Sequence, residues 1–94
     1  MPSYRTQVRI IADVLKTAND NGQDGVGITV LLRRANLSYS RLIKIVTTLL
    51  QSGLMEEIQL ENSSSRYRIS SKGVEFLMAY GRFEEFATSF GLNL

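Results

Sequence analysis

The spacing of the apolar residues changes at Gly53, and this change restricts the possible folds of the chain more than any other feature. Before Gly53, apolar residues recur at the spacing of one helical face. These residues are Leu42, Val46, Leu49 and Leu50. After Gly53 the period becomes two. Leu54, Ile58 and Leu60 alternate with Met55, Glu57 and Gln59, and after a polar segment Tyr67 and Ile69 alternate with Arg66 and Arg68. The pattern predicts a helix followed by a β-hairpin.

A second helix and a tight turn precede this pair of elements. Thr29 is the candidate N-cap of a short helix that continues to about Ala35, and Asn36 suits the left-handed residue that ends it. Ser38 is the candidate N-cap of the next helix, which ends near Ser52 with Gly53 beyond it. Two helices joined by so short a connection have the spacing of a helix-turn-helix.

Helices are also predicted at the two ends of the chain. Ser3 can cap a helix from Tyr4 that the segment 19–25, NDNGQDG, stops, and a short extended piece at 27–28 follows. This helix has apolar residues at Val8, Ile11, Leu15 and Ala18, backed by Ile10 and Val14. Ser70 or Ser71 can cap a last helix that reaches about Phe90. The fold class is therefore α+β, mostly α.

The last helix has two apolar faces. Val74, Leu77 and Met78 lie to one side and can close the core, whereas a second set repeats at spacings of 4, 3, 4 and 3. That set, the predicted heptad seam, is Phe76, Tyr80, Phe83, Ala87 and Phe90. A larger intramolecular core is one account of it. A homodimer is the interpretation we favour, because three helices already cover the hairpin and exposed phenylalanines would remain.

Positive charge is concentrated in the first half of the chain. Residues 1–50 contain seven Lys or Arg and three Asp, which gives +4, whereas residues 51–94 contain four Lys or Arg and six Glu, which gives −2. Between Asp24 and Glu56 there is no acidic residue, and this window holds Arg33, Arg34, Arg41 and Lys44. A local positive field of this kind is typical of a surface that meets nucleic-acid phosphate.

The composition excludes several chemistries. The 94 residues contain no Cys and no His, so disulfides, thiolate or imidazole catalysis and ordinary zinc sites are excluded. Glu56 and Glu57 are neighbours on a predicted strand and point to opposite faces, so they cannot act as a catalytic pair. We expect no enzyme activity and no cofactor, and no small-molecule ligand is evident. Without a signal segment or a long apolar run, the chain is expected to be cytoplasmic, with no membrane partner. If the basic surface meets DNA, the chain is also expected to be nucleoid-associated.

The order of elements and two segments resemble a known family. ITVLLRRANLSYSRLIKIVTTLLQSGLM and YRISSKGVEFLMAY are similar to the archaeal winged helix-turn-helix proteins whose small members dimerise through a C-terminal antiparallel coiled coil and bind DNA. The matching positions are Thr29, Ala35 to Tyr39, Leu49, Gly53, Leu54, Tyr67, Ile69, Lys72 and Gly73. The chain departs from the family at Ser70, where Thr is usual, and at Ile45, where an aromatic residue is common. The resemblance implies residues 1–70 as the winged domain and residues 71–94 as the dimerisation helix and tail.

The expected function is binding of double-stranded DNA by a homodimer, as a transcriptional regulator or a chromatin-associated protein. The candidate DNA-binding residues are Ser38, Ser40, Arg41, Lys44, Thr48, Arg66 and Arg68. Arg41 and Lys44 are the strongest candidates because they share one face of the predicted recognition helix. Tyr39 can lie over the sugar-phosphate chain or pack into the turn, and we expect it to pack into the turn. The alternative is a winged helix used for protein–protein interaction within a larger assembly, without DNA.

Overall fold

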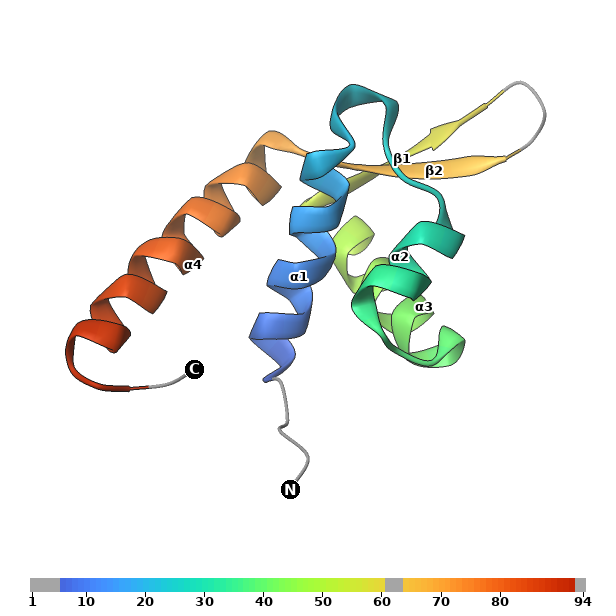
Figure 1. The fold of residues 1–94 in the computed structure, drawn as a ribbon. Coiled ribbons are helices and arrows are strands. Elements are labelled where there is room, and N and C mark those ends of the chain that lie inside the picture. Colours follow the sequence, from blue (N-terminus) through green and yellow to red (C-terminus); the bar gives the residue numbers. More distant parts are fainter. Residues whose placement is uncertain (1–5, 61–63, 93–94) are drawn as a thin grey trace.

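The computed structural model describes residues 6–60 and 64–92. Its elements are α1 (Gln7–Asp20), the short 3₁₀ turn η1 (Gly22–Asp24), α2 (Ile28–Ala35), α3 (Tyr39–Gln51), β1 (Met55–Gln59), β2 (Ser65–Ile69) and α4 (Ser71–Ser89). Helix α1 is central, with α4 on one side and the α2–α3 pair on the other, and the hairpin projects away from the helices (Figure 1). The predicted α+β class, mostly α, is confirmed.

Helix α1 forms the middle of the hydrophobic core. The predicted cap Ser3 lies outside the described residues, and α1 begins at Gln7 with Thr6 as its N-cap. The Thr6 Oγ1 atom accepts a hydrogen bond of 3.1 Å from the backbone N–H of Arg9. Val8 is 48% exposed, so the predicted apolar stripe of this helix does not extend to its first turn. The buried apolar residues of α1 are Ile10, Ala12, Val14, Leu15 and Ala18.

Because of pairing with the hairpin, α2 begins earlier than predicted. Val26 forms an isolated bridge to Tyr67, with reciprocal backbone hydrogen bonds of 2.7 and 2.8 Å. Because this bridge holds Val26 extended, the helix begins directly afterwards at Ile28, with Gly27 as its N-cap. The prediction that Thr29 caps α2 is therefore wrong, since Thr29 lies inside the helix.

The turn between α2 and α3 follows the prediction. Asn36 adopts the left-handed conformation, with φ of 56° and ψ of 49°. The Ser38 hydroxyl accepts a hydrogen bond of 3.4 Å from the backbone N–H of Arg41, so Ser38 is the N-cap of α3. Gly53, with φ of 81°, lies just beyond the C-cap Ser52. Each of these signals is local, because its partners lie within a few residues.

The two faces of the hairpin have different surroundings. The antiparallel register pairs Met55 with Ile69 and Glu57 with Tyr67. Met55 is fully buried, and Tyr67 and Ile69 pack against the core. We call this the core face of the hairpin; it comprises Met55, Glu57, Gln59, Ser65, Tyr67 and Ile69. By alternation the outer face comprises Glu56, Ile58, Arg66 and Arg68. Glu56 and Glu57 thus point to opposite faces, as predicted.

Ser70 joins the hairpin to α4. Its hydroxyl donates to the Gly53 carbonyl at 2.6 Å and accepts from the Gly73 N–H at 3.1 Å, which makes Ser70 the N-cap of α4. A Cβ atom on Gly73 would meet the Leu54 carbonyl oxygen, so the absence of a side chain allows this close packing. Val74 and Met78 were predicted to help close the core, but they are 36% and 54% exposed.

Candidate nucleic-acid interface

Helix α3 has a buried side and a polar, exposed side. Leu42, Ile45, Val46 and Leu49 are each at most 3% exposed and anchor the helix in the core. Ile45, where the family that the chain resembles commonly has an aromatic residue, is therefore a core position filled by an aliphatic side chain. The opposite arc of the helix carries the exposed residues Ser40, Arg41, Lys44, Thr47, Thr48 and Gln51. The predicted recognition surface is thus a single contiguous face of α3.

Arg41 and Lys44 are the two cations of this face. Within residues 6–60 and 64–92, no carboxylate forms an ion pair with either side chain. Arg33 and Arg34 are also exposed and lie in the last turn of α2, where a positive charge is favourable to the helix dipole. The described part of the acid-free window therefore presents four exposed basic side chains, and the structure brings Arg41 and Lys44 together on one helix face.

The hydroxyl residues of α3 have partly structural roles. Ser38 is the N-cap, and the Thr48 hydroxyl donates a hydrogen bond of 3.0 Å to the Lys44 carbonyl one turn earlier. Ser40 is exposed in the first turn of the helix. Of these three candidates, Ser40 is the one whose hydroxyl makes no hydrogen bond among those found in the described residues. The structural roles of Ser38 and Thr48 explain their positions without a ligand.

Tyr39 does not pack into the turn, contrary to our prediction. It is 59% exposed at the first residue of α3. Burial is the main cause that raises the pKa of the Tyr67 phenol, and the nearby Glu57 and Tyr39 raise it further. Tyr39 at the start of α3 therefore lies close enough to Tyr67, on the core face of the hairpin, to affect its titration. The sequence allowed both positions for Tyr39, over a sugar-phosphate chain or packed into the turn, and the packed position that we favoured is wrong.

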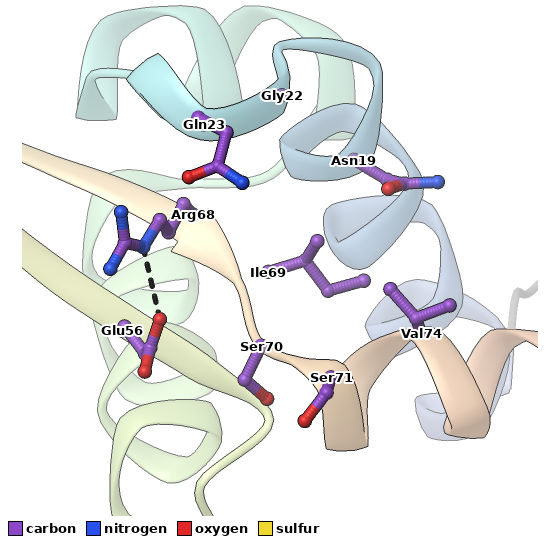
Figure 2. A pocket seen from close by; sticks show the side chains of 9 residues that line it. All are labelled: Asn19, Gly22, Gln23, Glu56, Arg68, Ile69, Ser70, Ser71 and Val74. Atoms are coloured by element: carbon purple, nitrogen blue, oxygen red, sulfur yellow. Dashed lines mark hydrogen bonds and ion pairs between the residues drawn. The ribbon is translucent and has the colours of Figure 1, made fainter.

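Arg66 and Arg68, the two candidate DNA-binding arginines of the hairpin, do not lie beside the exposed face of α3. Arg68 donates from Nε to Glu56 Oε1 at 3.0 Å, and Arg66 donates from Nη2 to the Gly25 carbonyl at 3.1 Å. Both belong to the outer face of the hairpin, which the η1 turn approaches. Figure 2 shows Arg68 beside Gln23, with its guanidinium joined to Glu56. The structure does not bring Arg66 and Arg68 together with Arg41 and Lys44, and their contact with DNA stays a prediction.

A hollow of about 370 Å³ lies between the outer face of the hairpin, the end of α1 and the start of α4. Figure 2 shows Ile69 and Val74 near each other in this hollow, with the Ser70 and Ser71 hydroxyls at the start of α4. The charged residues that line the hollow are Arg68 and Glu56, and they already pair with each other. Its lining therefore offers no uncompensated charge to a ligand.

The apolar surface of α4 differs from the predicted heptad seam. Tyr80 and Ala87 are buried, at 8% and 3% exposure, whereas Phe83 and Phe90 are 56% and 68% exposed. Helix α4 therefore turns part of the predicted seam toward α1, and Arg9 of α1 pairs with Glu84 of α4 at 3.6 Å.

The exposed apolar surface is displaced around the helix from that seam. Phe86 is 64% exposed and makes an edge-on contact with Phe90, with 5.0 Å between ring centroids. Ala79 is also exposed, and Phe76 is half-buried. We call the set the phenylalanine stripe, and its members are Phe76, Ala79, Phe83, Phe86 and Phe90. The spacings of 3, 4, 3 and 4 in the phenylalanine stripe also fit a heptad. The sequence therefore contained the pattern of the stripe, but spacing alone did not distinguish it from the predicted heptad seam.

Metal-binding clusters and membrane spans are absent from the described residues. Among them, no group of three or more His, Cys, Asp or Glu side chains is placed to hold a metal ion. None of the helices in the described ranges combines the length and the apolar character needed to cross a bilayer.

Solved structures with the same fold include a DNA-binding protein, Sso10a-2, and the PcaV transcriptional regulator from Streptomyces coelicolor. Sso10a-2, a DNA-binding protein from Sulfolobus solfataricus, superimposes with a TM-score of 0.76 and 22% identity, over 92% of this chain and 85% of that one. S. aureus MepR bound to ethidium bromide has a TM-score of 0.69 and 12% identity, over 92% of this chain and 62% of that one. SSV1 F-93 has a TM-score of 0.61 and 20% identity, over 92% of this chain and 97% of that one. At these identities the likeness concerns the fold. A comparison with curated protein sequences gave no match.

The family assignment rests on the sequence itself. The sequence profile of the winged helix-turn-helix family matches residues 4–88, which is most of the chain. The arrangement of α1, α2, α3 and the hairpin agrees with it. The chain therefore belongs to the winged helix-turn-helix family.

Proposed function

We propose that the protein binds double-stranded DNA, with α3 as the recognition helix. The observation that carries the proposal is the exposed face of α3, where Arg41 and Lys44 lie without acidic partners among the described residues. Basic side chains on the early turns of a helix that follows a helix-turn-helix turn are placed to meet phosphates and base edges in a major groove. Arg33 and Arg34 differ by about 100° around α2, so at most one of them is a further phosphate contact, and Ser40 is a polar contact.

We further propose that the protein acts as a homodimer, with residues 1–70 as the DNA-binding part and residues 71–94 as the dimerisation part. The phenylalanine stripe supports a second copy as the partner, because its heptad spacing suits a matching helix. Three phenylalanine side chains more than half exposed on one helix form an apolar surface that a monomer rarely leaves in water. Two linked recognition helices would engage two half-sites, which raises affinity through effective concentration.

The role that follows is regulation of transcription or organisation of chromatin by occupancy, without chemistry. Sso10a-2 is described as a DNA-binding protein and PcaV as a transcriptional regulator, and both have this fold. A modest net charge of +2 favours a regulator with a focused site over a strongly basic protein that coats DNA. Competition between a selected duplex and random duplex would separate the two roles, because a regulator retains a large specificity ratio.

A second candidate function is a protein–protein interaction module within a larger assembly. The same exposed phenylalanine stripe favours it, since an apolar surface can dock a different chain. Fluorescence anisotropy with a labelled random duplex at two salt concentrations decides between the functions. We expect affinity to fall steeply with salt because DNA binding releases counterions. Absence of duplex binding at low salt would reject the DNA proposal and favour the interaction module.

A further inference from the structure

The core face of the hairpin, next to the start of α3, carries an acidic side chain where a DNA-binding wing would be expected to carry basic ones. Toward the free end of the hairpin this face presents Glu57, Gln59 and Ser65. Arg66 and Arg68 point the other way, to the outer face. Within the described part of the hairpin, the core face therefore has no cation and one carboxylate.

Glu57 is exposed, but its carboxylate has a defined position. Its Oε2 atom accepts a hydrogen bond of 2.6 Å from the Ser65 hydroxyl on the opposite strand. The register places Glu57 directly across from Tyr67. After burial, the charges of Glu57 and of Tyr39, the first residue of α3, are the causes that raise the pKa of the Tyr67 phenol. The carboxylate therefore lies on the side of the hairpin that faces the recognition helix. A duplex seated on α3 would bring its phosphate backbone toward this side.

A carboxylate in that place opposes the general attraction between a protein and DNA. Non-specific affinity comes almost entirely from phosphate contacts, whereas sequence is read at base edges. A fixed negative charge beside the backbone lowers affinity for every duplex, so base contacts from α3 make up a larger part of the total. A repulsive group can in this way increase discrimination between partners.

We propose that Glu57 is a specificity-determining residue, which holds the wing away from the phosphate backbone and keeps the affinity for non-specific DNA low. This inference rests on the proposed DNA-binding function, with α3 as the recognition helix. It assigns the two faces of the hairpin different roles. The core face limits non-specific contact. On the outer face Arg66 ties the hairpin to the Gly25 carbonyl, and Arg68 joins the two strands through Glu56.

The neighbouring glutamate gives a matched control. Glu57→Gln and Glu56→Gln each remove one negative charge, from adjacent residues on opposite faces of the same strand. The amide oxygen that Glu57→Gln introduces still accepts the Ser65 hydrogen bond, so the position of the side chain is retained. Thermal unfolding would confirm that both variants are folded. Affinity for labelled random duplex is then measured by anisotropy between about 50 and 200 mM salt, the range over which phosphate contacts change affinity strongly.

We expect Glu57→Gln to bind random duplex about threefold more tightly at the low-salt end and to steepen the log–log salt slope by up to about 0.9, the effect of one further phosphate contact. Glu56→Gln should change affinity clearly less. Equal gains in the two variants would mean that net charge alone matters, and would overturn the proposal. A larger gain from Glu56→Gln would place DNA on the outer face and overturn it too. Unchanged or weaker binding of random duplex by Glu57→Gln would overturn it as well.

Failure of the DNA-binding function itself gives a different result. A parent protein without salt-dependent duplex binding would remove both the function and the role of Glu57. A parent that binds duplex and loses affinity with Arg41→Ala and Lys44→Ala, while the two glutamine variants behave alike, would retain the function and reject the role of Glu57.

Discussion

Truncation of Phe86 to Ala should dissociate the proposed dimer while leaving the fold of the subunit intact. Phe86 belongs to the phenylalanine stripe but not to the predicted heptad seam, so it tests the surface that the structure exposes. In the subunit it is 64% exposed and contacts Phe90. Its removal creates little or no core cavity, and we expect thermal stability of the subunit to change by less than about 1 kcal/mol.

The size of the effect follows from the exposed fraction. Complete burial of a phenylalanine side chain contributes about 1.5–3 kcal/mol. With 64% of that surface still available, each copy has about 1–2 kcal/mol to gain in a dimer. The stripe occurs twice in a symmetric dimer, so the substitution removes about 2–4 kcal/mol of association free energy. At about 1.4 kcal/mol per factor of ten, the dissociation constant should rise by roughly thirty-fold to several-hundred-fold.

Sedimentation equilibrium measures this constant directly, and Met78→Ala is the matched control. Met78 is 54% exposed on the same helix but on a different face from the stripe, so its loss should leave the dimer unchanged. Equal weakening by both substitutions would show that any exposed apolar side chain contributes, and would refute the argument. A parent that sediments as a 10.6 kDa monomer at tens of micromolar would refute it more simply.

The other predictions concern DNA binding, helix stability and pH. Arg41→Ala combined with Lys44→Ala should remove most duplex affinity in anisotropy titrations and flatten the log–log salt slope by about 1.8, or about 0.9 per phosphate contact, with unchanged thermal stability; parental affinity would exclude α3 as the recognition helix. Gly81→Ala should stabilise α4 by about 1 kcal/mol in chemical denaturation, because no atom outside the local backbone of α4 lies within 4 Å of the added Cβ in the described residues. A loss of stability would contradict this. Burial is the first cause that raises the pKa of Tyr67 and of Tyr80, so the folded state holds these protons more tightly, and unfolding free energy should fall as pH rises above about 10. Denaturation at about pH 9 and about pH 11, on either side of the ordinary phenol pKa, should show a smaller fall in Tyr67→Phe/Tyr80→Phe than in the parent.

The sequence by itself determined the elements whose signals are local. Asn36, Ser38 and Gly53 act on backbone groups only a few residues away, as does Ser70 when it caps α4 through the Gly73 N–H. The apolar spacing of α3 does not depend on what covers it. The helix-turn-helix and the exposed face with Arg41 and Lys44 were therefore predictable. Local signals did not give the start of α2. The bridge between Val26 and Tyr67, two residues far apart in the sequence, sets where that helix begins.

Tertiary structure decided which of two equivalent faces is buried. Strand alternation separates Glu56 from Glu57, but only packing of Met55 and Tyr67 against the helices shows which glutamate faces α3. In α4 the predicted heptad seam and the phenylalanine stripe have the same periodicity. The choice between them depends on which side of α4 contacts α1. Periodicity gives the angle between side chains along one element, whereas the direction in which a face points depends on the neighbouring elements, and no spacing within the element contains that information.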